Sequence, residues 1–243
     1  MKILDQADQR KLSKHDTAVA LAWDTVHDAL VDAAEVDLSW IQPPPRNDWW
    51  TLAPDALRFL VSLVTYVRPR HILELGSGLS TRVLAWACAE SQPSCRITSI
   101  DHDPEYSQIA QKEFAACPLS SHVKFQVAPL VARTYARKLL PTYYLRRSQF
   151  ASRRPVDLIL IDGPVWPLGG REGTLYQILE LTRPGTIVLL DDASRKEEAG
   201  VLANWQAVLG DAIEVRLLPN FLKGLAAIIV REPHILVRPG PHT

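Results

Sequence analysis

Residues 72–81 read ILELGSGLST, a short apolar run that contains an acid, Glu74, and leads into two glycines. We expect a buried strand here, followed by a tight turn and the start of a helix. Glycine has no Cβ, so such a turn lets backbone N–H groups and the positive end of a helix dipole come close to a ligand. A second apolar run, 96–100, is followed by another acid, Asp101. The two acids strengthen the prediction of a ligand-binding turn.

The composition predicts one large domain, alone or with an extension. The chain has 243 residues, of which 47% are hydrophobic, enough for a full core. Lys+Arg and Asp+Glu number 27 each, so net charge does not indicate a nucleic-acid or membrane partner. Cys88, Cys95 and Cys117 lack metal-ligand spacing, which favours reduced thiols in a cytoplasmic protein. We recognise no signal peptide, and no apolar run approaches the ~20 residues of a membrane span.

Residues 1–50 are expected to form an N-terminal extension. Apolar residues recur every three or four positions between Val19 and Val31, which predicts an amphipathic helix. This helix would pack on the main domain or on a partner subunit of a homo-oligomer. The prolines and tryptophans that follow, up to Trp50, predict an extended connection, pinned to the domain surface or lining a substrate cleft. Residues 51–232 would be the main domain and 233–243 a tail.

Helices and strands are expected to alternate through the main domain. Pro54 suits the first turn of a helix, and Asp103 with Pro104 suits the start of another. Ser194 and Glu197 have the spacing of a capping box. Strands are expected at 72–75, 96–100, 123–127, 156–161 and 186–190. The last two are continuous apolar runs, as in a parallel sheet covered on both faces, so we predict a doubly wound α/β fold.

Two further strands, 213–218 and 225–230, are separated by only six residues. Such a connection is too short for a helical crossover, so the two must pair antiparallel. A parallel sheet closed by a terminal antiparallel hairpin resembles the class I S-adenosylmethionine-dependent methyltransferases, from about residue 50 to residue 232. The resemblance implies a Rossmann-like seven-stranded sheet and S-adenosylmethionine as the cofactor.

The resemblance also implies the cofactor site. In the family's first motif, which 74–78 resembles, the loop backbone holds the methionine part and the acid works near the amino or ribose end. Asp101 matches the acid that binds the ribose hydroxyls. His102 would lie near the adenine or, alternatively, at the surface. The residues expected to bind the cofactor are Glu74, Gly76, Ser77, Gly78, Ser80, Asp101, His102 and Asp162.

A nicotinamide dinucleotide fold is the competing interpretation of these motifs, since it uses the same acid after its second strand. It fits less well, because Ser80-Thr81 stand where its third glycine would be. In many methyltransferases an acid after the third strand contacts the adenine. Residues 128–130, Ala-Pro-Leu, occupy that place here.

Later motifs narrow the family resemblance. The series Asp162-Gly163-Pro164, Gly170-Arg171 and 191–195 (DDASR) is similar to that of methyltransferases acting on small-molecule or carbohydrate hydroxyls. Glucuronoxylan O-methyltransferases are distant members with a similar series. The resemblance therefore implies O-methylation of a small-molecule or sugar hydroxyl. A non-catalytic protein that binds the cofactor or a partner on the same fold is the alternative.

The acids of these motifs follow two neighbouring strands, so we expect Asp162, Asp191 and Asp192 to converge. Such carboxylates need a compensating cation or proton. Mg²⁺ or another divalent cation bound by all three is one solution, although catechol-type relatives usually have Asp-Asn where this chain has Asp-Asp. Pairing with Arg171 or Arg195, with one carboxylate as general base, is another. Asp192 could also simply cap a helix. All five residues are catalytic candidates.

A basic segment precedes these motifs. Between Phe114 and Val156 the sequence has no acid but eight basic residues, namely Lys124, Arg133, Arg137, Lys138, Arg146, Arg147, Arg153 and Arg154. Beside the crevice, such a segment would favour an anionic acceptor. A solvated helical face is the alternative, and RNA is a weaker one.

Overall fold

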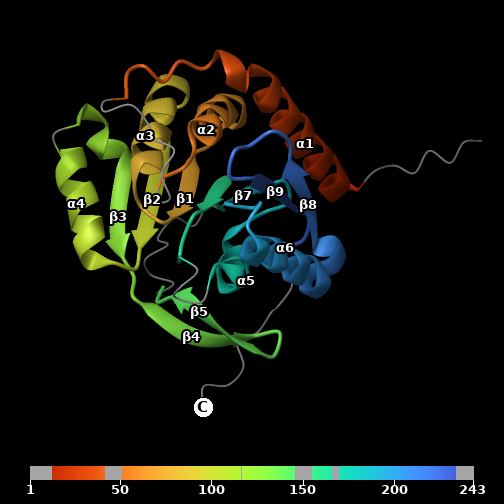
Figure 1. Cartoon of the computed structure of the whole chain (residues 1–243). Helices are drawn as coiled ribbons and strands as arrows, with labels where there is room; N and C mark the ends of the chain where they lie inside the picture. The colour runs from red at the N-terminus through yellow and green to blue at the C-terminus, as the bar shows by residue number, and fades with distance from the viewer. Residues whose placement is uncertain (1–12, 42–50, 116, 146–154, 166–169, 234–243) are drawn as a thin grey trace, which may run out of the picture.

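The computed structural model describes residues 13–41, 51–115, 117–145, 155–165 and 170–233 (Figure 1). Seven strands form one mixed sheet in the order β3-β2-β1-β6-β7-β9-β8. The strands are β1 (His71–Leu75), β2 (Arg96–Asp101), β3 (Val123–Val127), β6 (Leu158–Ile161), β7 (Ile187–Asp191), β8 (Ile213–Leu218) and β9 (Leu225–Val230). The first five run parallel, and β9 is antiparallel to both of its neighbours. The predicted doubly wound sheet with a terminal hairpin is confirmed.

Helices cover both faces of the sheet because each strand turns alternate apolar side chains to opposite sides. On β1, Ile72 joins the core under α1 (Lys14–Asp32), α2 (Pro54–Val67) and α3 (Leu79–Ser91). Leu73 and Leu75 join the other core, under α5 (Glu172–Ile178) and α6 (Lys196–Leu209). The remaining α-helix, α4 (Pro104–Ala115), contacts β3 at one edge (Figure 1). Short 3-10 helices span Ala33–Glu35, Pro118–His122, Leu179–Leu181 and Gly210–Ala212.

The described part of the N-terminal extension packs on the domain itself. Helix α1 starts with a capping box of Ser13 and Asp16 and buries Val19 and Val26 in the core shared with α2. The indole of Trp23 donates a 2.8 Å hydrogen bond to Glu214 on β8. The predicted helix is thus confirmed over residues 14–32, while residues 1–12 lie outside the described part.

The extended connection after α1 is described only as far as residue 41. Within it, Trp40 stacks on Trp86 of α3, with ring centroids 4.6 Å apart. This contact agrees with a tryptophan that pins the connection to the domain surface. Trp49 and Trp50, and the proposed tail beyond residue 233, lie outside the described residues.

Two of the three predicted helix starts are confirmed. Pro54 is the first residue of α2, and the Asp103 carboxylate accepts the backbone N–H groups of the first turn of α4. The capping box at Ser194 is wrong, because α6 begins at Lys196 with Arg195 as its N-cap. The Ser194 N–H instead donates to the Lys223 carbonyl at 3.2 Å, which keeps the chain in a turn for one more residue.

An antiparallel hairpin, β4 (Leu130–Tyr135) and β5 (Lys138–Tyr143), lies between β3 and β6 in the chain. It carries Arg133, Arg137 and Lys138 of the basic segment, so the helical alternative is wrong for these residues. The two-residue turn is Ala136-Arg137, both with positive φ, and lacks the glycine or asparagine that marks such turns in a sequence. Tyr135 and Tyr143 are buried. The arginines between 146 and 154 lie outside the described residues.

Across the described ranges, we find no helix with the length and apolar character needed to cross a membrane.

The hairpin packs tightly on α5, which gives a stability test. A Cβ added at Gly173 would lie 2.5 Å from the Pro141 carbonyl oxygen and 2.7 Å from Thr142 Cγ2. We expect Gly173→Ala to lower the free energy of unfolding by about 1–3 kcal/mol through overpacking. Gly200→Ala on α6 is the matched control, because nothing lies within 4 Å of that Cβ position. There the better helix propensity of alanine should raise stability by up to ~1 kcal/mol. Urea unfolding measures the stability of both variants. A Gly173→Ala variant as stable as the wild type would contradict this packing.

Candidate active site

The turn after β1 lies directly against the segment after β6. Gly76 has φ +101°, a conformation that side-chain-bearing residues rarely adopt. A Cβ at this position would be 3.2 Å from both the Asp162 carbonyl carbon and the Gly163 nitrogen. Glycine is therefore needed both for the backbone conformation and for the close approach of the two loops.

Glu74 supports this turn from inside the domain. Its fully buried carboxylate accepts hydrogen bonds from Ser80 Oγ at 2.6 Å, Thr81 Oγ1 at 2.5 Å and Ser99 Oγ at 2.6 Å. Burial raises the pKa of Glu74 to about 7, against the opposing effect of the three hydroxyl hydrogen bonds. Of the residues predicted to bind the cofactor, Glu74 and Ser80 thus contact each other, and Glu74 joins β1 to α3 and β2.

Asp101, at the end of β2, fixes the same turn through the backbone. Its Oδ2 accepts the Ser77 N–H at 2.9 Å and its Oδ1 accepts the Asp103 N–H at 2.9 Å. Each carboxylate oxygen has a further lone pair, so the side chain keeps the capacity to accept hydroxyl groups of a ligand. The half-buried His102 lies beside it, with Nδ1 3.4 Å from Asp101 Oδ1. The glycine turn and this acid together fit a nucleoside-containing cofactor.

The three predicted acids do converge. Asp162 follows β6, Asp191 ends β7, and Asp192 comes next with φ 59°. One carboxylate oxygen from each lies within 4.8 Å of the others. The parallel arrangement of β6 and β7 produces this cluster, because both strands end at the same edge of the sheet.

Arg171 lies among these acids with only 2% of its side chain exposed. Its Nη2 is 3.0 Å from Asp162 Oδ1 and 2.9 Å from Asp192 Oδ2, and its Nη1 donates to the Asp191 carbonyl at 2.7 Å. Arg195 Nη1 also lies 2.9 Å from Asp192 Oδ2. The predicted arginine pairing is present. The alternative in which Asp192 caps α6 is wrong, since its side chain binds the two arginines and α6 has no side-chain cap.

Negative charge still exceeds positive charge around Arg171. The cluster comprises four acids and two arginines once Glu198 is included, whose Oε1 lies 4.0 Å from Arg171 Nη1. Burial raises the pKa of Asp162 well above its ordinary value, although Arg171 opposes this, and burial with Asp192 raises the pKa of Asp191 to about 6. Burial disfavours the charged Arg171, but the carboxylates outweigh it and raise its pKa.

A divalent cation would fit the remaining charge. Asp191 Oδ1 and Asp192 Oδ1 are buried and lack a hydrogen-bond partner among the described residues. Hard cations such as Mg²⁺ prefer carboxylate oxygens as ligands. The donor set and the orphaned oxygens are therefore compatible with the ion that the sequence suggested.

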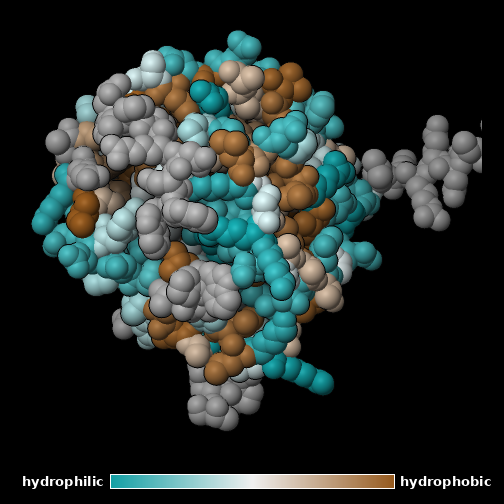
Figure 2. Space-filling view, in the orientation of Figure 1, coloured by the Kyte–Doolittle hydropathy of each residue, from teal (hydrophilic) through white to brown (hydrophobic). Residues whose placement is uncertain are grey.

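Tyr143 is a site residue that the sequence analysis did not single out. Its hydroxyl is buried without a partner in the described part of the chain, and a Cβ on Gly163 would lie 2.4 Å from it. Burial raises the pKa of Tyr143 well above its ordinary value, so it is a neutral donor at physiological pH. The β4-β5 hairpin brings Tyr143 to the site, and the Ala136-Arg137 turn of that hairpin has no residue that would predict it. Figure 2 shows hydrophilic side chains gathered in the middle of this face of the molecule.

An open, mainly parallel sheet with a glycine turn after its first strand and acids at its carboxyl edge defines a Rossmann-like enzyme fold. A family model described as a methyltransferase domain matches residues 73–193. A catechol O-methyltransferase of Niastella koreensis is 27% identical over 149 residues, which span 60% of this chain and 59% of that protein. Together with the fold, these two matches support a class I S-adenosylmethionine-dependent methyltransferase.

Solved structures show the same fold. The O-methyltransferase of Bacillus cereus in complex with SAH has a TM-score of 0.54 at 17% identity, covering 89% of this chain and 99% of that one. The O-methyltransferase TomG of Streptomyces achromogenes in complex with SAM has a TM-score of 0.54 at 15% identity, covering 90% and 99%.

The buried Glu74 makes stability depend on pH. Its pKa is about 7 in the folded chain against an ordinary value of 4.5, so folding favours the protonated carboxyl. This stabilisation is fully present below about pH 4.5 and is lost as the pH rises through about 7. With about 1.4 kcal/mol per pKa unit, the loss amounts to roughly 3 kcal/mol.

Glu74→Gln cannot ionise, so its free energy of unfolding should fall less than that of the wild type between about pH 5 and pH 8. Urea denaturation at the two pH values measures the difference. Glu90→Gln, at an exposed position of α3, is the control and should behave like the wild type. Parallel pH profiles for Glu74→Gln and the wild type would contradict a buried, titrating Glu74.

Proposed function

We propose that this protein transfers the methyl group of S-adenosylmethionine to the hydroxyl oxygen of a small-molecule or sugar acceptor. The observation that carries the proposal is the contact between the two halves of the site. The Gly76 turn, which suits the donor, lies against the backbone of Asp162 and Gly163, where the acid cluster begins. A methyl donor held by the turn would therefore lie next to the carboxylates, where the acceptor would bind.

The cofactor would be held by Gly76, Ser77, Gly78, Asp101 and His102. Asp101 would accept the ribose hydroxyls with the lone pairs left free by its two backbone hydrogen bonds. Glu74 and Ser80 would not contact the cofactor themselves. They would hold the turn in its conformation through their mutual hydrogen bond. The Tyr143 hydroxyl would be an additional donor toward the ligand.

The cofactor supplies an already activated methyl group, so the protein has to place the acceptor in line and receive its proton. Asp191, with a pKa raised to about 6, would be largely ionised at neutral pH and suited to accept that proton. In the alternative arrangement, Asp162, Asp191 and Asp192 would together hold a divalent cation, which when bound makes an acceptor hydroxyl more acidic. Arg171 would keep the carboxylates in place.

The similarity to a catechol O-methyltransferase supports a hydroxyl acceptor. The anionic acceptor stays a prediction, and the described part of the basic segment lends it little support. Lys138 pairs with Glu172 at 3.1 Å, and Lys124 lies near the start of β3, at the opposite edge of the sheet from the acids.

Replacing Asp191 tests the acceptor side of the site. We expect Asp191→Asn to lower turnover by about 10²-fold or more, because it removes the proton acceptor, while SAH affinity changes only slightly. Turnover is measured with S-adenosylmethionine and catechol as the probe acceptor, and SAH binding by calorimetry. Asp211→Asn, at an exposed position of a 3-10 helix, is the control. Full turnover in Asp191→Asn would refute the assigned role.

Cation binding is tested apart from activity. After exhaustive chelation, Mn²⁺ titrated into the protein should bind at one site, seen by electron paramagnetic resonance. Asp192→Asn should weaken this binding strongly, whereas Asp211→Asn should not, since only Asp192 belongs to the acid cluster. Activity that survives chelation unchanged, with no saturable Mn²⁺ binding, would leave Asp191 as a metal-free general base.

A further inference from the structure

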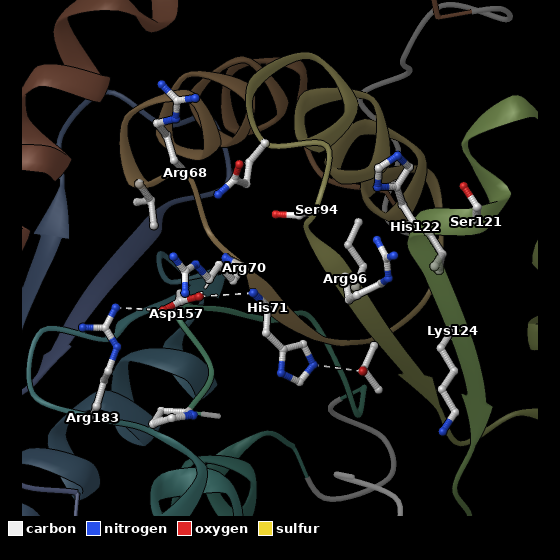
Figure 3. Close-up of a pocket in the computed structure, with 16 residues that line it drawn as sticks. Arg68, Arg70, His71, Ser94, Arg96, Ser121, His122, Lys124, Asp157 and Arg183 are labelled. Atoms are coloured by element: carbon white, nitrogen blue, oxygen red, sulfur yellow. Dashed lines mark hydrogen bonds and ion pairs between the residues drawn. The ribbon is translucent and has the colours of Figure 1, made fainter. Parts of the chain in front are cut away.

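A pocket of about 880 Å³ opens at the edge of the sheet opposite the acid cluster. It is lined by the starts of β1, β2 and β3 and by the loop before β6 (Figure 3). His71 lines the pocket at the start of β1, and five residues of extended chain separate it from Gly76, which is roughly 17 Å at about 3.3 Å per residue. The proposed methyltransferase site therefore does not account for this pocket.

Basic side chains dominate the lining. Five of the residues are arginine or lysine and one is a carboxylate, although the whole chain carries 27 residues of each sign. The basic residues are Arg68, Arg70, Arg96, Lys124 and Arg183, all exposed. A concave surface lined by one sign of charge concentrates ligands of the opposite sign.

The parallel register brings these residues together. His71 pairs with Arg96 between β1 and β2, and Thr98 pairs with Lys124 between β2 and β3. Arg68 and Arg70 come just before β1. Parallel strands begin at the same end of the sheet, so these positions lie close together although they are far apart in the sequence.

The single carboxylate, Asp157, neutralises only part of this charge. Its Oδ1 lies 2.8 Å from Arg183 Nη2, and its Oδ2 accepts the backbone N–H groups of Arg70 and His71 (Figure 3). Within the described ranges, the other four basic side chains make no ion pair, and Arg96 donates only to the neutral carbonyl of Cys95. Four exposed cations of the lining therefore have no carboxylate partner in the described part of the chain.

Polar groups complete the lining. His71 is buried, its Nε2 lies 3.0 Å from Thr98 Oγ1, and its Nδ1 has no partner among the described residues. Ser94 and Ser121 add hydroxyl groups to the lining. Clustered guanidinium, ammonium and hydroxyl donors are the groups that bind phosphate oxygens.

We propose that this pocket is a second binding site, for a small anion that carries several linked phosphate groups. The volume falls within the range of small-molecule sites, about 300–1,000 Å³. Four uncompensated positive charges match the charge of a triphosphate chain. Inorganic polyphosphate and a nucleoside triphosphate share this chemistry and are distinguished by experiment.

Tripolyphosphate, ATP and AMP serve as probes and are titrated by calorimetry in phosphate-free buffer. The salt concentration is about 0.01 M, at which the Debye length is ~30 Å and salt screens the pocket charges only weakly. We expect saturable binding of tripolyphosphate and ATP that weakens as salt increases, with AMP much weaker. Equal affinity for tripolyphosphate and ATP would assign recognition to the phosphate chain alone. Tighter ATP binding would assign a contact to the nucleoside as well.

The double variant Arg70→Glu/Arg96→Glu should weaken tripolyphosphate binding by about tenfold or more, because it reverses two of the pocket charges. Arg183 stays unchanged, since it pairs with Asp157. At about 0.15 M salt, where the Debye length is about 8 Å, Lys112→Glu on the exposed face of α4 should leave tripolyphosphate binding within about twofold of the wild type. SAH affinity reports whether each variant is folded. If the double glutamate variant does not fold, Arg70→Gln/Arg96→Gln takes its place. No saturable binding, or equal loss in Lys112→Glu, would overturn the proposal irrespective of methyltransferase activity.

Discussion

The buried guanidinium of Arg171 is the constraint on which the carboxyl edge of the sheet depends. A charge with 2% exposure is tolerated only when it is paired and hydrogen-bonded. Its partners come from the ends of two strands, through Asp162 and the Asp191 carbonyl, and from the residue after β7, Asp192. The arginine therefore fixes the spacing of the acids before any ligand arrives, and the acids in turn keep the arginine charged. Such preorganisation is what a site for methyl transfer requires, because placement is its main task.

Much of this fold could be predicted from the sequence because its signals are local. Apolar runs gave the strands, and a six-residue connection was enough to predict the terminal hairpin. The convergence of Asp162 with Asp191 followed from parallel topology alone. Which group neutralises these acids could not be predicted, because a metal site and an arginine pair use the same acidic residues. The side-chain geometry shows that Arg171 lies between Asp162 and Asp192. The β4-β5 hairpin was missed because its Ala136-Arg137 turn has no characteristic residue.

Glu74 shows why a motif does not fix the role of each of its residues. In sequence it is the acid before the glycine turn, and the family resemblance places it near the cofactor. Three hydroxyls, from positions 80, 81 and 99, surround its carboxylate in the structure. No spacing rule links these positions, because two lie on α3 and one on β2. The acid thus stabilises the turn that presents the glycines, which also explains why it is fully buried.

Net charge does not describe how charge is distributed over this sheet, because parallel strands bring distant residues together at two opposite edges. Strands that run the same way collect their first residues at one edge and their last residues at the other. Here β2 begins with Arg96 and ends with Asp101, and the segment of β6 leads to Asp162. Residues that flank other strands add to both edges, such as Arg70 before β1 and Asp192 after β7, so a basic pocket and an acidic cluster form at opposite ends of the parallel strands. A formal charge of zero is therefore compatible with two sites of opposite sign, one suited to carboxylate chemistry and the other to an anionic ligand.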